Sequence, residues 1–142
     1  MTTRDDEFII TRRVLHLGNL LINSQQDEFD KFSLTFVQAE ALFFFDKIKG
    51  ARAIDLKEHL NISHQAARSI VDRLCKKEYL HRKTSSEDAR AKQIYLTPSG
   101  QAACDELKQL GLSDGQRLLK QINAKERQQI LSLLKKMIAN VQ

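Results

Sequence analysis

The chain has 142 residues, with one proline, five glycines and a formal net charge of +5 at neutral pH. This length allows one domain with a sizeable core, and the shortage of proline and glycine favours helices over loops. The sequence contains no run of about 18 apolar residues and no signal-peptide pattern, which argues against a membrane protein and predicts a cytoplasmic one. Its two cysteines are far apart in the sequence, so a disulfide framework is not expected either.

The charge is unevenly distributed along the chain. Residues 1–46 hold 4 Lys or Arg and 8 Asp or Glu, residues 47–92 hold 12 and 6, and residues 93–142 hold 7 and 4. Positive charge therefore collects in the middle segment, where a polyanion would dock.

Two helices are expected before this basic segment. The first covers residues 7–29 and carries an apolar stripe that is wider than one packing partner needs. After a link at residues 32–34, Thr35 is followed by Gln38 three residues later, which is a capping-box pattern. The second helix therefore begins at Thr35 and is expected to end near Gly50.

The basic segment itself is predicted to be a helix-turn-helix. Residues 53–60 form its first helix, residues 61–63 break it, and a second helix runs from His64 to about Glu78. Ser63 is a good N-cap for the second helix, because its hydroxyl can accept from the unpaired N–H groups of the first turn. Apolar residues of this helix recur at helical spacing, so its other face is polar and basic.

This polar face carries residue types that read DNA. Arg can fork onto guanine and Gln can pair with adenine when a helix of this length enters the major groove. The alternative is a solvated face of a small helical domain, which the coincidence of a turn, a cap and a basic face disfavours. The predicted DNA-binding residues here are Ser63, His64, Gln65, Arg68, Ser69, Arg73 and Lys76.

A two-stranded hairpin is predicted after the second helix. Residues 79–84 and 92–96 are the strands, and the polar residues 85–91 are the loop between them. Thr97 then caps another helix, with Pro98 at the first helical position, where no N–H is needed. The strands add two predicted DNA-binding residues, Arg82 and Lys92.

Two helices complete the chain. Gly111 and Gly115 are expected to bend or loosen the helix that starts at Pro98. Asn123 and Glu126 form a second capping-box pattern at the start of the last helix. Its apolar residues, like those of the first helix, exceed what one small chain can easily cover, which favours a second copy as the partner. An ordinary intramolecular bundle is the alternative.

The hairpin and the helix after it contain Arg82, Asp88, Arg90, Leu96-Thr97 and Gly100 in that order. Their spacing is similar to the wing signature of the MarR family of bacterial transcriptional regulators, and the resemblance extends over nearly the whole chain. It implies a mainly α fold with a small β-hairpin wing (α+β), a winged helix-turn-helix with helical dimerisation arms. It also implies that Arg90 enters the minor groove and that Asp88 holds the basic residues around it.

The resemblance implies a function as well. Family members are homodimers that bind a pseudo-palindromic operator, commonly as repressors released by a small molecule or by oxidation. The DNA-binding region would be residues 35–97, and the dimerisation region residues 1–34 and 98–142, in one intertwined domain. The alternative function is a winged-helix module whose basic face binds a protein partner. An enzyme is least expected, since no phosphate-binding loop, metal motif or nucleophile elbow is visible.

Three positions or segments depart from the family pattern. Lys57 follows Leu56 where a small residue is common. Glu78 stands where the family often has glycine after the second helix of the motif, and because Glu tolerates left-handed backbone poorly, this helix is expected to end differently. The first helix lacks the cysteine through which some relatives sense peroxide.

Any sensing of an effector or of oxidation is therefore expected at other residues. The candidate effector pocket is His16, Phe44 and Phe45, for a small organic molecule; the aromatic run at residues 43–45 is expected mainly as core and alternatively as a pocket wall. The histidines are scattered, so no metal and no cofactor are expected. Cys75 and Cys104 are expected mainly as small buried residues, with a thiol sensor at Cys75 as the alternative.

Overall fold

The computed structural model describes residues 3–84 and 92–142, which form six helices and one two-stranded antiparallel sheet. In chain order the elements are α1 (Thr3–Lys31), α2 (Phe36–Lys47), α3 (Ala53–Leu60), α4 (His64–Lys76), β1 (Leu80–Thr84), β2 (Lys92–Leu96), α5 (Pro98–Leu118) and α6 (Ala124–Val141). The predicted fold class, a mainly α winged helix-turn-helix with a small hairpin, is confirmed.

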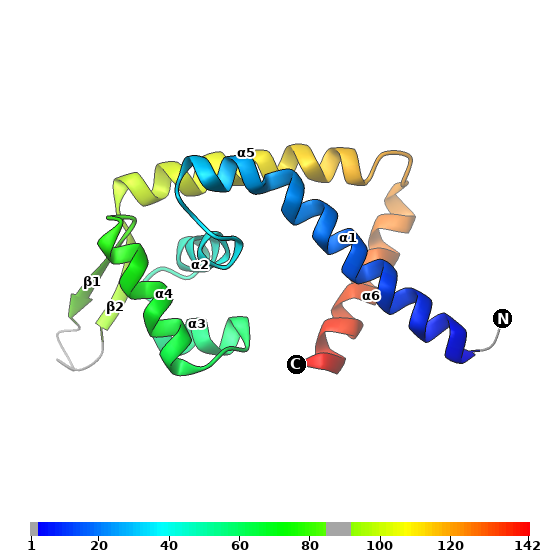
Figure 1. The fold of residues 1–142 in the computed structure, drawn as a ribbon, viewed down its shortest axis with the longest axis horizontal. Coiled ribbons are helices and arrows are strands. Elements are labelled where there is room, and N and C mark those ends of the chain that lie inside the picture. The colour runs from blue at the N-terminus through cyan, green and yellow to red at the C-terminus, as the bar shows by residue number, and fades with distance from the viewer. Residues whose placement is uncertain (1–2, 85–91) are drawn as a thin grey trace.

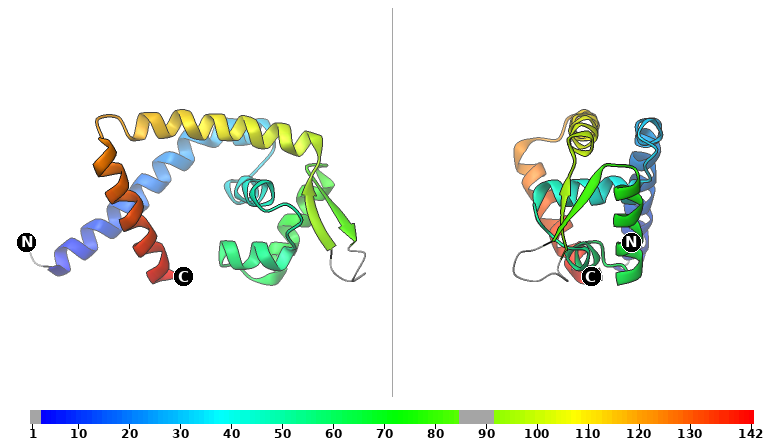
Figure 2. Two further views of the ribbon diagram at one scale, coloured as in Figure 1. Left: turned by 180° about the vertical axis from the view of Figure 1, so that it is seen from behind. Right: turned by 90° about the vertical axis from the view of Figure 1, so that its left-hand side faces the viewer.

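The elements are arranged as an arch (Figure 1). Helix α5 spans the top, and α2, α3, α4 and the hairpin lie together under one end of it. Helices α1 and α6 extend towards the other end, and the view from behind shows the same separation (Figure 2). The division into a DNA-binding region at residues 35–97 and a dimerisation region at residues 1–34 and 98–142 stays a prediction.

The hydrophobic core lies where α2 packs against α4, α5 and β2. Its largest buried side chains include Leu42, Phe45, Leu56, Leu74 and Ile94. Phe29 of α1 and Leu107 of α5 belong to the same cluster, so the long helices are attached to the winged end through its core.

The predicted helix caps are confirmed. The side chains of Thr35, Ser63, Thr97 and Asn123 each accept a hydrogen bond from a backbone N–H in the first turn of α2, α4, α5 and α6. In α2 and α6 the capping box is complete, because the side chain of the third helical residue accepts from the cap's own N–H in return.

Several predicted boundaries shift by a few residues. Helix α1 is longer than predicted at both ends, and α2 stops at Lys47, before Gly50. Helix α4 ends at Lys76 rather than at Glu78, and β1 starts at Leu80. Hydrophobic periodicity does not encode the terminal turns, where capping and tertiary contacts decide the last residue.

Gly111 and Gly115 do not interrupt α5, which runs without a break from Pro98 to Leu118. Asp114 lies between the two glycines and is almost fully buried. Its carboxylate accepts from Gln25 Nε2 at 3.0 Å and from Ser24 Oγ at 3.3 Å, both on α1. These contacts hold α5 against α1 and offset the low helix propensity of glycine.

The expectation for Glu78 is wrong. Glu78 adopts the left-handed conformation, with φ of 64°, that glycine usually supplies. The N–H of Tyr79 donates to Leu74 O at 2.9 Å and that of Glu78 to Cys75 O at 3.0 Å, which is the Schellman pattern. Thr97 Oγ1 donates to Glu78 O at 2.6 Å and fixes this arrangement from outside the helix.

Replacing Glu78 with Gly is expected to stabilise the fold by up to about 1 kcal/mol. The left-handed conformation costs an L-residue about 1–2 kcal/mol, and glycine avoids this strain. Glycine also loses more conformational entropy on folding, which reduces the gain in stability by about 0.5–1 kcal/mol. Urea denaturation measures the difference. The control is Lys76→Gly, two positions earlier in the last turn of α4, which should destabilise by up to about 1 kcal/mol. Equal losses in both variants would contradict the prediction.

Candidate nucleic-acid interface

Helix α4 turns its polar face to solvent because its apolar face packs into the core. Ala67, Val71 and Leu74 are 0% exposed. Asn61 ends α3 with a left-handed φ of 54°, and the Ser63 cap begins α4, so the two helices are joined by a tight turn. The predicted DNA-binding residues of this turn and helix, Ser63, His64, Gln65, Arg68, Ser69, Arg73 and Lys76, are all exposed.

The hairpin places its two predicted cations on its inner face. Leu80 pairs with Leu96, Arg82 with Ile94, and Thr84 with Lys92. Directly opposite residues share a face of a sheet, and the face alternates along each strand. Ile94 is only 1% exposed, so this face points into the protein, and exposed Arg82 and Lys92 form its outer edge.

The segment before α3 is joined to the same hairpin. The N–H of Ile94 donates to Ala51 O at 2.9 Å, and the N–H of Gly50 donates to Ile94 O at 3.3 Å. Gly50 has a φ of 81°, which favours glycine. These bonds set Arg52, the residue before α3, beside β2.

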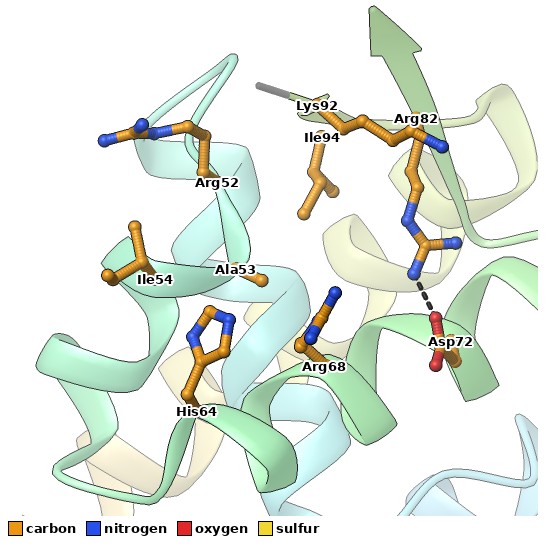
Figure 3. A pocket seen from close by; sticks show the side chains of 9 residues that line it. All are labelled: Arg52, Ala53, Ile54, His64, Arg68, Asp72, Arg82, Lys92 and Ile94. Carbon is orange, nitrogen blue, oxygen red and sulfur yellow. Dashed lines mark hydrogen bonds and ion pairs between the residues drawn. The ribbon is translucent and has the colours of Figure 1, made fainter. Parts of the chain in front are cut away.

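Helix α4, the start of α3 and the hairpin enclose a cavity of about 520 Å³ (Figure 3). It is lined by Arg52, Ala53, Ile54, His64, Arg68, Asp72, Arg82, Lys92 and Ile94. The lining contains four cationic side chains, one carboxylate, one histidine and three apolar side chains. In Figure 3 the Arg68 side chain points towards the middle of this group, whereas Arg52 extends away from the other cations.

The carboxylate in the cavity, Asp72, forms an ion pair with Arg82. Arg82 Nη2 donates to Asp72 Oδ1, which connects α4 to β1. The Arg82 side chain is 33% exposed and that of Asp72 is 65% exposed, so the pair lies at the surface. The pair gives the guanidinium of Arg82 one preferred direction.

The structure thus brings together four predicted residues, His64, Arg68, Arg82 and Lys92, around one cavity. The remaining predicted residues of α4 are exposed along the helix. The predicted wing residues Asp88 and Arg90 lie outside the described residues. Their roles stay predictions.

Among the charged residues that line this cavity, two were not predicted as site residues, Arg52 and Asp72. Helical spacing does predict Asp72 on the polar face of α4, one turn after Arg68, but it predicts no role for the carboxylate there. Its partner Arg82 and the approach of Arg52 to β2 depend on tertiary contacts.

The candidate effector residues lie in different surroundings. Phe45 is 0% and Phe44 is 6% exposed, so both belong to the core, as mainly expected. Phe44 contacts Phe45 edge-on, with ring centroids 5.1 Å apart, and stacks on His59 at 4.9 Å. His16 is exposed on α1. An effector site that uses these three side chains stays a prediction.

The two cysteines are free thiols; Cys104 is buried and Cys75 half-buried. Burial raises the pKa of the Cys104 thiol to about 11. Burial also raises the pKa of Cys75, against the opposing effect of nearby Arg82. Because the thiolate is the reactive form, these shifts disfavour either cysteine as a thiol sensor at neutral pH.

Residues 3–84 and 92–142 contain neither a metal-binding cluster nor a helix that could span a membrane. No group of three or more His, Cys, Asp or Glu side chains there is placed to hold a metal ion. None of the helices in the same residues combines the length and the apolar composition that a membrane span requires.

Comparison with known proteins gives a consistent picture. Residues 32–91 match the model of the MarR family. No curated protein sequence matches the chain. Many solved structures do, and those described next are MarR-type regulators.

Three solved structures illustrate the similarity. The S. aureus MepR–DNA complex has 20% sequence identity and a TM-score of 0.84, covering 96% of this chain and 99% of that chain. The transcriptional regulator SlyA has 22% identity and a TM-score of 0.85, covering 93% of each chain. MarR from E. coli, in its apo form, has 27% identity and a TM-score of 0.69, covering 88% of this chain and 94% of that chain.

Proposed function

Because the chain belongs to the MarR family through residues 32–91, we propose that it is a cytoplasmic transcriptional regulator that binds duplex DNA as a homodimer. The observation that carries this proposal is the basic cavity between α4 and the hairpin, next to the exposed polar face of α4. A helix of this kind enters the major groove, and the hairpin then lies along the neighbouring backbone. One structural neighbour, S. aureus MepR, was solved in a complex with DNA.

The homodimer is supported by apolar surface on the terminal helices. Val14 of α1 is 47% exposed, and Leu134 and Ile138 of α6 are 41% and 53% exposed. These side chains line a groove of about 670 Å³ between α1 and α6. Apolar surface of this kind on a soluble chain favours association, and two identical grooves can cover each other around a two-fold axis.

A two-fold dimer determines what the operator looks like. Its two α4 helices would read two half-sites in opposite directions, with centres about one helical turn of DNA apart, so the operator is a pseudo-palindrome. The family resemblance adds the expectation of a repressor that is released by a small organic effector.

The test is selection of bound sequences from a random duplex pool, followed by binding measurements at several salt concentrations. We expect an inverted repeat and an affinity that falls steeply with salt, because phosphate contacts release counterions. The alternative, a winged-helix module that binds a protein partner, predicts no enriched sequence. A pool without enrichment at low salt would therefore contradict the proposed function.

Arg68→Ala is expected to cost about 1–3 kcal/mol on the selected operator and to blur the preference at one or two base pairs. Arg68 is exposed in the second turn of α4, where side chains reach base edges. Titration of a set of single-base operator variants measures both effects. Lys125→Ala, which removes the same charge from exposed α6, is the control and should change neither.

Arg90→Ala should change DNA binding in a different way from Arg68→Ala if Arg90 enters the minor groove. Binding to all sequences should weaken by similar amounts, apart from some lost preference for A·T-rich flanks. The salt dependence should also flatten by about one unit per site. A loss confined to particular bases of the half-site would contradict the role implied for Arg90.

A further inference from the structure

The edge of the hairpin beside α4 holds two cations at fixed positions. Arg82 pairs with Ile94, and Lys92 lies two residues before Ile94 on the same strand, so Arg82 and Lys92 are diagonal neighbours on one face. Diagonal neighbours in an antiparallel pair are within reach of each other when the side chains are long. Both side chains line the basic cavity.

The chemistry of these two side chains limits what they can bind. Arg and Lys carry hydrogen-bond donors and no acceptors, and the adjoining cavity surface of Ala53, Ile54 and Ile94 is apolar. A guanine edge offers two acceptors but no net charge, whereas a phosphodiester offers acceptors together with a full negative charge that two neighbouring cations can share. The pair therefore suits a backbone phosphate better than a base.

Asp72 carries a negative charge, which is unexpected for a residue in a DNA interface. It is 65% exposed on the polar face of α4, where a negative charge would repel a phosphate. However, its carboxylate accepts from Nη2 of Arg82 and thereby orients the guanidinium across the gap between α4 and β1. A guanidinium has five donors, so the group remains able to donate to a second anion.

We propose that Arg82 and Lys92 hold one phosphodiester group of the DNA backbone in each half-site, and that Asp72 is the positioning residue that orients Arg82 for it. Arg68, which faces the same cavity from α4, is left to read base edges. This inference rests on the proposed function and adds the group that the hairpin edge recognises.

The experiment uses the tightest duplex from the random-pool selection. Its phosphates are replaced one at a time by uncharged methylphosphonates, and the Kd is measured for the wild type, Arg82→Ala, Lys92→Ala and Asp72→Asn. In the wild type, neutralising one phosphate in each half-site should weaken binding about ten-fold, as expected for a lost charge-assisted contact. In Arg82→Ala the same replacement should cost less than about two-fold, because the two changes remove one interaction.

Asp72→Asn separates positioning from simple charge. Although it removes a negative charge, it should weaken binding to the unmodified duplex and reduce the penalty at that same phosphate. The control is Lys83→Ala, since Lys83 is exposed on the strand next to Arg82 but on the opposite face. It should keep the full phosphate penalty. If Arg82→Ala does not fold, Lys92→Ala and Asp72→Asn carry the same test.

Three results would overturn the inference. In the first, Asp72→Asn binds as tightly as the wild type, or more tightly, and keeps the full phosphate penalty. In the second, Asp72→Asn changes the preferred base at one position, which would make Asp72 a base-reading residue. In the third, no phosphate is coupled to Arg82 although the duplex is bound, which removes this inference and leaves the proposed function intact. A chain that enriches no duplex overturns both.

Discussion

A double variant with Leu134→Glu and Ile138→Glu is expected to be monomeric or unfolded, and to lose at least about 100-fold in affinity for an inverted-repeat duplex. Both side chains line the apolar groove between α1 and α6. In a dimer each Glu would be buried without a partner, which costs several kcal/mol per charge. A monomer would bind only one half-site, so the contribution of the second would be lost.

Light scattering measures the mass, circular dichroism the helix content, and a gel shift the affinity. The control carries Gln129→Glu and Ser132→Glu, which add the same charge to exposed positions on the other side of α6 and should leave the dimer intact. If the double variant unfolds, the single Ile138→Glu variant should show weakened dimerisation. A wild-type chain that is a folded monomer at micromolar concentration would contradict the dimer.

Gly100→Ala is expected to destabilise the fold by about 3 kcal/mol, the upper part of the range for overpacking. Gly100 is buried in the first turn of α5, where a Cβ would lie 2.0 Å from Tyr79 O and 2.9 Å from Tyr79 C. Both are backbone atoms, so no side-chain rotation can relieve the clash. Helix α5 would have to move away, which breaks the 3.0 Å hydrogen bond from Thr97 N to Tyr79 O.

Chemical denaturation of the variant gives the change in unfolding free energy. Gly111→Ala is the matched control in the same helix, because a Cβ there meets nothing within 4 Å. It should stabilise by about 0.5–1 kcal/mol, since alanine favours the helix and restricts the unfolded chain. Equal stability of the two alanine variants would show that the approach of Tyr79 to Gly100 does not constrain this position.

The left-handed turn at Glu78 and the close packing at Gly100 depend on the same contacts. Thr97 links them, since its hydroxyl donates to Glu78 O and its N–H donates to Tyr79 O. The turn after α4 and the start of α5 therefore form one packed unit. This explains how a Glu can hold a left-handed conformation where glycine is more usual.

The helices and the exposed polar face of α4 could be predicted from the sequence alone. The reason is that their determinants are local. The apolar residues of α4 repeat every three or four positions, and the Ser63 cap reaches a backbone N–H only three residues away. The two strands of the hairpin could also be predicted, because residues 92–96 alternate and the polar residues 85–91 separate them from residues 79–84. Their register comes from the structure.

Only the tertiary structure decided the continuity of α5, the left-handed Glu78 and the partner of Asp72. Each depends on a contact between elements that are distant in the chain. Asp114 is held by Gln25 of α1, Glu78 by Thr97 of the segment before α5, and Asp72 pairs with Arg82 of β1. Residue propensities predict glycine at a left-handed position, and they predict a less stable helix around Gly111 and Gly115. Tertiary packing can outweigh such preferences, which are about 1 kcal/mol each. The cavity that combines α3, α4 and the hairpin exists for the same reason: the backbone bond between Ile94 and Ala51 brings together segments that no local pattern relates.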